Sequence, residues 1–438
     1  MTGGMLPYIL FVLVMYLGVV FQNIKNLYIN KIGQIFILFV FFGVAGLSYK
    51  IHNDYFVYEN VYYWVNKENI EFLRFEIGYK YLNYIFNKYL TFYQFKAMIY
   101  FFNTILIYLG LRKIVSKKET YLTIAFLYIG FSQFYRVYFS AFRQSIAIAI
   151  FIYSLSYLKE RKFWRYMCLI VIATLFHESA ILLVPVYFFY NIKIKQKMSK
   201  IIVTYIIFSI LSFNNSVINF IKELAIKIIS LLNYTINSDY LDTLSYTGYI
   251  YTIFILMTLI LDYMIEDPLL ERKKGDFIYM SLFLFIIINF LGKLLAIFFR
   301  IEIYFYIFYF IFFIRLLNRL NKEICFFLLK IVFIFLLILN YNLKYIYVDY
   351  KERGGYIPFL TLLDENLKEI NYQETAEYAQ AHSLYSRDTT LKEMKERIKK
   401  IYFSKEWFKK IKHFLVIRLM LYLFLKKFNK SKLVVFLL

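Results

Sequence analysis

The feature that most constrains this chain is the recurrence of apolar stretches long enough to cross a lipid bilayer. The stretch 324–340 carries one charged residue in 17, and about 20 predominantly apolar residues suffice for a transmembrane helix. Comparable stretches recur along the chain, and they are continuous instead of alternating, which argues against the strands of a membrane barrel. The predicted spans lie near 5–23, 32–48, 93–111, 120–137, 140–158, 201–220, 248–265, 277–297, 298–314 and 324–345.

Composition supports the same fold class. Of the 438 residues, 61% are hydrophobic and only 18% are charged, whereas a soluble domain has about 45–50% apolar and about 25% charged residues. We therefore predict an all-α, polytopic integral membrane helical bundle with about 11–14 membrane segments. Cys168 and Cys325 each lie alone in an apolar run, so we interpret them as small hydrophobic residues and not as a disulfide or metal site.

The net charge of +23 comes from 52 Lys and Arg residues against 29 Asp and Glu residues. Membrane proteins concentrate Lys and Arg in cytoplasmic loops, and alternate connections of this chain are basic. We therefore assign the charge to membrane orientation and predict no nucleic-acid partner. The N-terminus, the loop 49–92, the turn 136–143 and the loop 221–247 then face outside.

We divide the chain into a transmembrane core, residues 1–348, and a polar basic tail, residues 349–438, with a surface helix near 405–427. Between Lys392 and Lys432 the tail holds 14 basic and 3 acidic residues. The number of predicted spans places this tail outside, whereas its charge favours the cytoplasm, so both sides stay open.

One apolar stretch, 164–190, does not fit the simple pattern of spans. Its 27 residues would form a helix of about 40 Å, yet basic clusters flank both ends, so a single span would place one cluster outside. Two spans of about 13 residues would be too short for a hydrocarbon core of about 30 Å. We therefore predict a broken or re-entrant hairpin with its turn at 176–179, and irregular backbone at membrane depth is tolerated where it lines a wet cavity.

Ionisable groups at membrane depth are costly and are therefore functional candidates. Arg136 and Arg143 precede a span, His177 and Glu178 lie at the hairpin break, and Arg300 lies where a span emerges outside. Guanidinium groups bind phosphate oxygens in a bidentate manner, and imidazole accepts a proton near neutral pH. The alternatives are structural: arginines that reach lipid headgroups, a histidine bonded to a backbone carbonyl, and an ion pair between Arg300 and a neighbouring glutamate.

The first outer loop offers a second group of candidates, Asp54, Tyr55 and Glu76. Carboxylates among aromatic rings are typical of sugar-binding sites, although Asp54 is equally compatible with a solvated loop position. The sequence has no HExxH motif, paired CxxC, glycine-rich phosphate loop or GxSxG elbow. It therefore gives no support to zinc enzymes, kinases, ATPases or serine hydrolases, and we predict no metal site.

A recognisable pattern covers residues 142–189: an arginine followed by small residues, a basic turn, and an Ala-x-x-x-His-x-Ser-Ala run ending in Pro185. With these residues the chain resembles the EpsG family of bacterial exopolysaccharide proteins, which is grouped with Wzy-type polysaccharide polymerases. The resemblance extends over roughly residues 1–360. Further matching motifs are Asp54-Tyr55-x-x-Tyr58, Glu76-x-Gly78-Tyr79, Arg300 with Tyr304, and Tyr356-Ile-Pro358-Phe359.

The resemblance implies a GT-C-like glycosyltransferase in the bacterial cytoplasmic membrane with its active site facing the periplasm or cell exterior. It would polymerise undecaprenyl-diphosphate-linked repeat units without metal, nucleotide sugar or other cofactor. The implied partners are the lipid-linked glycan donor and acceptor, membrane lipid and a chain-length regulator. In that reaction Arg143 and Arg300 would neutralise the diphosphate, and His177 would take the acceptor proton, with Glu178 or Asp54 orienting it.

Other functions remain open from the sequence. The nearest is a polyprenyl-phosphate-sugar-dependent GT-C glycosyltransferase that uses Asp54 as its base. A lipid-linked oligosaccharide flippase would also have many spans, but flippases tend to show two related halves, and we find no internal repeat. A purely structural membrane protein would leave the charged residues at the hairpin break without a role.

Overall fold

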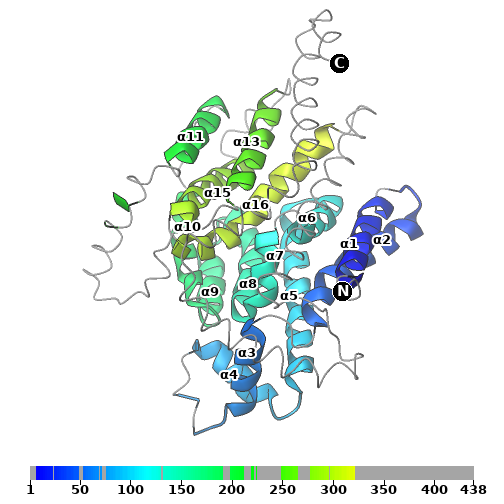
Figure 1. Cartoon of the computed structure of the whole chain (residues 1–438), viewed down its shortest axis with the longest axis vertical. Coiled ribbons are helices and arrows are strands. Elements are labelled where there is room, and N and C mark those ends of the chain that lie inside the picture. Colours follow the sequence, from blue (N-terminus) through cyan, green and yellow to red (C-terminus); the bar gives the residue numbers. More distant parts are fainter. Residues whose placement is uncertain are drawn as a thin grey trace, which may run out of the picture. The chain divides into compact units, whose positions relative to one another are not determined.

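A computed structural model describes residues 6–22, 24–48, 53–68, 70–71, 75–129, 132–190, 198–211, 219–220, 223, 248–264, 277–294 and 296–320. The chain divides into two compact units, residues 1–372 and 373–438, and all described residues belong to the first. The regular structure in them is entirely helical (Figure 1). The predicted span near 324–345, the boundary at residue 348 and the predicted tail helix near 405–427 lie outside the described residues.

The first two helices form a close hairpin. Helix α1 (Leu6–Phe21) packs against α2 (Leu27–Gly46), and the side chain of Asn26 caps α2 by accepting from the backbone of the next turn. A Cβ at Gly33 would lie 2.6 Å from the Gly18 carbonyl oxygen, so glycine permits this close contact. The chain continues through α3 (Asn53–Trp64), α4 (Ile77–Phe86) and α5 (Phe92–Ile114), which begins with a capping box of Thr91 and Gln94.

The central helices are α6 (Lys117–Ile129), α7 (Ser132–Ser140) and α8 (Phe142–Lys159). Helices α6 and α7 cover the predicted span 120–137 except for residues 130 and 131, which lie outside the described residues, so whether the span is one helix stays a prediction. Helices α5 and α8 touch at Gly110, where a Cβ would lie 2.5 Å from the Ile152 carbonyl oxygen.

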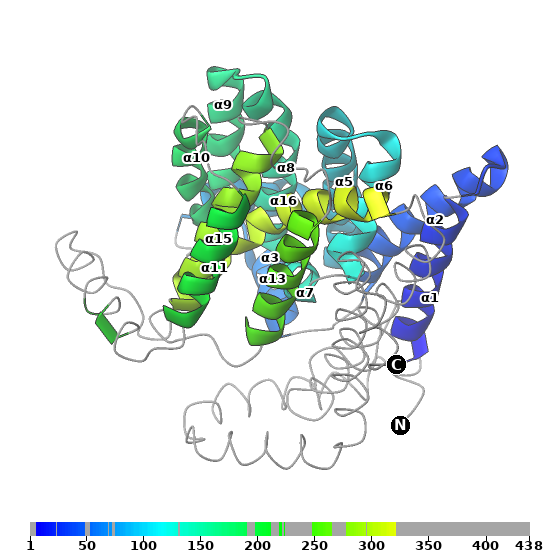
Figure 2. The same cartoon turned by 90° about the horizontal axis from the view of Figure 1, so that it is seen from above.

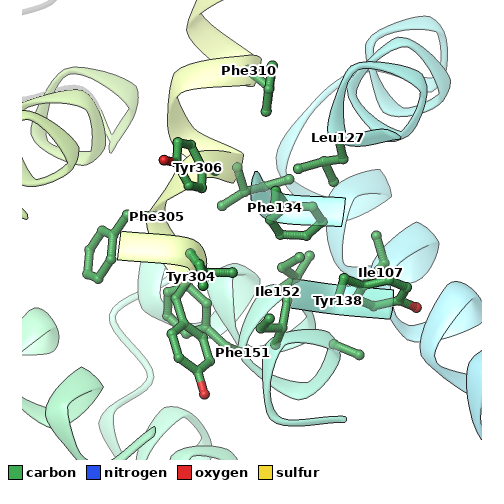
Figure 3. Packing of buried hydrophobic residues seen from close by; sticks show 14 of the residues in the cluster. Ile107, Leu127, Phe134, Tyr138, Phe151, Ile152, Tyr304, Phe305, Tyr306 and Phe310 are labelled. Carbon is green, nitrogen blue, oxygen red and sulfur yellow. The ribbon is translucent and has the colours of Figure 1, made fainter. Parts of the chain in front are cut away.

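The second half contains α11 (Met198–Leu211), α13 (Gly248–Met264), α15 (Phe277–Leu294) and α16 (Ala296–Leu320). Helix α16, yellow in Figures 1 and 2, contacts α6, α7, α8 and α15. Its residues 301–314 are all buried, as expected for a helix that is apolar on every face. Aromatic rings fill this part of the core: Tyr304 packs on Phe151 with ring centroids 5.7 Å apart (Figure 3).

Among the described residues, three helical stretches are long and apolar enough to cross a membrane: Leu27–Gly46, Phe92–Ile114 and Arg300–Arg319. Shorter apolar helices accompany them. The prediction of a polytopic helical membrane bundle is confirmed, and the number of its membrane segments stays a prediction.

The broken hairpin predicted at 164–190 is also present. It consists of α9 (Phe163–Thr174), a turn at 175–177, the 3₁₀ helix η2 (Glu178–Leu183) and α10 (Val184–Phe189). Helix α9 has 12 residues and is about 18 Å long, too short to cross a hydrocarbon core of about 30 Å. The hydroxyl of Tyr166 donates to the carbonyl oxygen of Leu183 at 2.8 Å, which ties the two arms together and fixes the direction in which the turn points.

Candidate functional site

The turn of the hairpin is organised around His177. This residue is the N-cap of η2: its Nδ1 accepts a hydrogen bond from the backbone N–H of Ser179 at 3.3 Å. The same Nδ1 lies 2.7 Å from the Ser179 hydroxyl oxygen. Only 6% of His177 is exposed. The ring is therefore fixed by its capping role, while one edge is left for other contacts.

Glu76, the N-cap of α4, connects the turn to the start of that helix. Its Oε1 accepts from the backbone N–H of Glu178 at 3.2 Å, and its Oε2 forms an ion pair with Arg143. Two residues later, the backbone N–H of Gly78 donates to the Leu175 carbonyl oxygen at 2.8 Å. A Cβ at Gly78 would lie 2.8 Å from that same oxygen, so the Glu-x-Gly motif clamps the turn and requires glycine.

Arg143 lies in the first turn of α8 and faces an aromatic surface. Its guanidinium carbon lies 4.5 Å from the ring centroid of Phe75 and 6.0 Å from that of Tyr58. A positive charge is unfavourable at a helix N-terminus, and the carboxylate of Glu76 offsets it. Rings and carboxylate together hold the guanidinium beside the turn.

Helix α16 completes the site from the other side. The Tyr304 hydroxyl lies 3.2 Å from the Ser179 hydroxyl oxygen, and the Gln144 amide of α8 donates to the Arg300 carbonyl oxygen at 2.8 Å. Burial, together with the positive charges of Arg143 and Arg300, lowers the pKa of His177 to about 3. The imidazole is therefore neutral at physiological pH.

The structure brings together Glu76, Arg143, His177, Glu178 and Arg300, which come from the start of α4, from α8, from the hairpin and from α16. Glu178 contributes its backbone N–H to Glu76, and its side chain is exposed.

The other predicted site residues lie differently. Tyr55 is 1% exposed, and its ring packs on Phe92 with centroids 5.2 Å apart, so the structure places it in the core. Asp54 and Arg136 belong to α3 and α7, and their side chains lie outside the described part of the chain.

Three residues were missed as site residues: Gln144, Ser179 and Tyr304. The His-x-Ser spacing at a helix start was a usable signal for Ser179, because an N-cap side chain contacts the backbone two residues later. Tyr304 lies one helical turn after Arg300, on the same face. Gln144 gave no such signal, since its partner is 156 residues away.

Within the described residues, no group of three or more His, Cys, Asp or Glu side chains could hold a metal ion. The arrangement offers instead two guanidinium groups, one neutral imidazole, two hydroxyls and one exposed carboxylate. Such groups bind anions and transfer protons without a metal.

Fold and site together define a polytopic helical membrane protein with a charged cluster at the turn of a broken hairpin. A family model, described as the EpsG family, matches residues 30–361, which is more than half of the chain and contains every residue of the site. The chain belongs to the EpsG family. No curated protein and no solved structure matches it. Family membership supports a polysaccharide polymerase-like membrane protein.

Proposed function

We propose that this protein polymerises undecaprenyl-diphosphate-linked oligosaccharide repeat units at the outer face of the bacterial cytoplasmic membrane. The reaction is a metal-independent glycosyl transfer from a lipid-diphosphate donor to a hydroxyl of an incoming lipid-linked repeat unit. The enzyme is a multi-pass, GT-C-like glycosyltransferase of O-antigen, capsule or exopolysaccharide synthesis, and a chain-length regulator is its expected partner.

One observation carries this proposal: Arg143 and Arg300, from two different helices, both act electrostatically on the buried His177 at the hairpin turn. Two guanidinium groups whose charges act on the same hydrogen-bonding imidazole suit a diphosphate, because they neutralise charge as the leaving group departs. The ion pair with Glu76 holds Arg143 at the turn before substrate arrives, so its position does not depend on the ligand.

The reaction balances without a further reactant. The acceptor hydroxyl oxygen forms a bond to the anomeric carbon of the donor sugar, and the bond from that carbon to the diphosphate oxygen breaks. The lipid diphosphate leaves with the electron pair. The hydroxyl proton passes to a base at the turn, for which His177 and Glu178 are the two candidates.

The direct test uses purified protein in nanodiscs, supplied with lipid-linked repeat units. We expect chains longer than one repeat from the wild type, and about 100-fold slower elongation from Arg300→Gln, the loss typical of removing one preorganised charge-stabilising group. The matched control is Arg165→Gln, which removes an exposed arginine of α9 in the same hairpin, and its rate should stay within about twofold of wild type.

Three outcomes would contradict the proposal. If no longer chains form, the polymerase function is wrong. If lipid-linked units cross the bilayer of proteoliposomes that contain the protein but do not lengthen, the protein is a flippase. If Asp54→Asn abolishes transfer while His177→Ala retains it, the polyprenyl-phosphate-sugar-dependent transferase is the better assignment.

A further inference from the structure

The hydrogen bonds of His177 fix which of its nitrogens carries the proton. The backbone N–H of Ser179 donates to Nδ1 at 3.3 Å, and an amide N–H can only donate. Nδ1 must therefore present its lone pair. A neutral imidazole carries one proton, so that proton lies on Nε2.

A second chain of hydrogen bonds from α16 reinforces this tautomer. The Ser179 hydroxyl lies 2.7 Å from Nδ1 and 3.2 Å from the Tyr304 hydroxyl. With Nδ1 as an acceptor, Ser179 donates its hydroxyl proton to Nδ1, and Tyr304 donates to the Ser179 oxygen. Both donors to Nδ1 thus belong to Ser179 of η2, and Tyr304 of α16 orients the hydroxyl of that serine.

The surroundings of the ring disfavour a second proton. The positive charges of Arg143 in α8 and Arg300 in α16 both oppose a positive charge on the imidazole. The nearby carboxylate of Glu76 is already paired with Arg143 and with the Glu178 N–H. Among the described residues, the other titratable groups near this turn include the Glu178 side chain, the Tyr304 hydroxyl and, beside Arg143, the Tyr58 hydroxyl.

We propose that His177 assists the transfer as a hydrogen-bond donor through Nε2–H, to an oxygen of the lipid diphosphate, and that it is not the base. Within the part of the chain that the structure describes, Nε2 forms no hydrogen bond with the protein. Neutral imidazoles act in this way in other enzymes, where they polarise an oxygen on which charge develops. This inference rests on the proposed function.

If His177 keeps its proton, a residue other than His177 must accept the proton of the acceptor hydroxyl. As the bond from the anomeric carbon to the diphosphate oxygen breaks, Nε2–H strengthens its hydrogen bond to the departing oxygen and keeps its proton. The acceptor hydroxyl transfers its proton to the carboxylate of Glu178, which is adjacent in sequence and exposed.

Two substitutions separate the donor from the base. His177→Gln places an amide N–H near the position of Nε2 but has no basic nitrogen. His177→Asn reproduces the cap, because Asn is among the best N-cap residues, but its amide is too short to replace Nε2. We expect His177→Gln to elongate chains within about 10-fold of wild type, and His177→Asn and His177→Ala to be about 100-fold slower, with His177→Asn keeping the wild-type melting temperature.

If wild type is active and His177→Gln is as inactive as His177→Ala with an unchanged melting temperature, the donor role is wrong. If wild type forms no longer chains, the proposed function has failed instead. A readout independent of activity is ¹⁵N NMR of the histidine-labelled full-length protein. The signal that disappears in His177→Asn should show a proton on Nε2 and none on Nδ1 between pH 5.5 and 8, and a protonated Nδ1 would overturn the inference.

Discussion

At the scale of single residues, Glu76 shows how a side chain suited to binding a ligand is used to position other groups. A carboxylate among aromatic rings suggested sugar binding. In the structure its two oxygens bind Arg143 and the Glu178 N–H, which come from two different elements. The residue therefore fixes the distance between the guanidinium and the hairpin turn.

Replacing Glu76 by Ala should destabilise the protein, because Arg143 would keep a half-buried charge without its partner. We expect a loss of about 1–3 kcal/mol, less than for a fully buried pair because both side chains are partly exposed. The measurement is thermal unfolding in detergent, with exposed Glu68→Gln as the control. An unchanged melting temperature for Glu76→Ala would show that the clamp contributes nothing to stability.

The pKa of His177 leads to a prediction of stability against pH. Folding lowers this pKa from 6.5 to about 3, so the unfolded chain binds the proton more readily. The contribution of the neutral His177 to the free energy of unfolding is complete above about pH 6.5 and is lost as the pH falls toward 3. As the pH is lowered over this range, the melting temperature of wild type should therefore decrease more steeply than that of His177→Asn. Parallel curves of melting temperature against pH for the two proteins would contradict this.

At the scale of elements, the hairpin was predictable, whereas its partners were not. Its basic flanks argued against a single span, and its length of 27 residues is too short for two spans. A broken hairpin was the arrangement that fitted both features. The residues at the break form hydrogen bonds with residues far away in the sequence. Glu178 and Glu76 are separated by 102 residues, and Ser179 and Tyr304 by 125. Sequence spacing carries no signal for such contacts, since tertiary packing alone decides them.

The high density of aromatic residues explains why Tyr55, a predicted site residue, lies in the core instead. With 22% aromatic residues, the sequence does not distinguish a ring that lines a site from one that fills the core. Charged residues are rarer at membrane depth, and each placement there has a stronger physical reason. Accordingly, Arg143 and Arg300 both act electrostatically on His177 at the turn, while Tyr55 belongs to the core.

The contact between α5 and α8 gives a prediction at this scale. Gly110→Ala would place a Cβ 2.5 Å from the Ile152 carbonyl oxygen, a backbone atom that moves only with its helix. We expect a loss of about 1–3 kcal/mol, the usual cost of overpacking. Gly43→Ala is the matched control, because its Cβ would meet nothing closer than 3.8 Å. Equal melting temperatures for the two variants would contradict this packing.

At the scale of the whole molecule, the proposed orientation places the basic residues at the base of the hairpin and the site at its turn on opposite sides of the membrane. In a background with both cysteines changed to Ser, Lys162→Cys should react with a membrane-impermeant thiol reagent only from the cytoplasm. Glu178→Cys should react only from outside. Both positions are exposed, so burial does not limit the reaction, and labelling of Glu178→Cys from the cytoplasm would reverse the proposed orientation.

Helix α16 is the last described helix, yet it supplies Tyr304 and Arg300 to a turn formed more than a hundred residues earlier. Because a chain is synthesised from its N-terminus, the hairpin and Glu76 enter the membrane before α16 exists. A ribosome-bound chain therefore carries an incomplete site until α16 has been inserted. Biogenesis itself thus delays activity, and a protein arrested before residue 296 should have no transferase activity even when its earlier helices are correctly inserted.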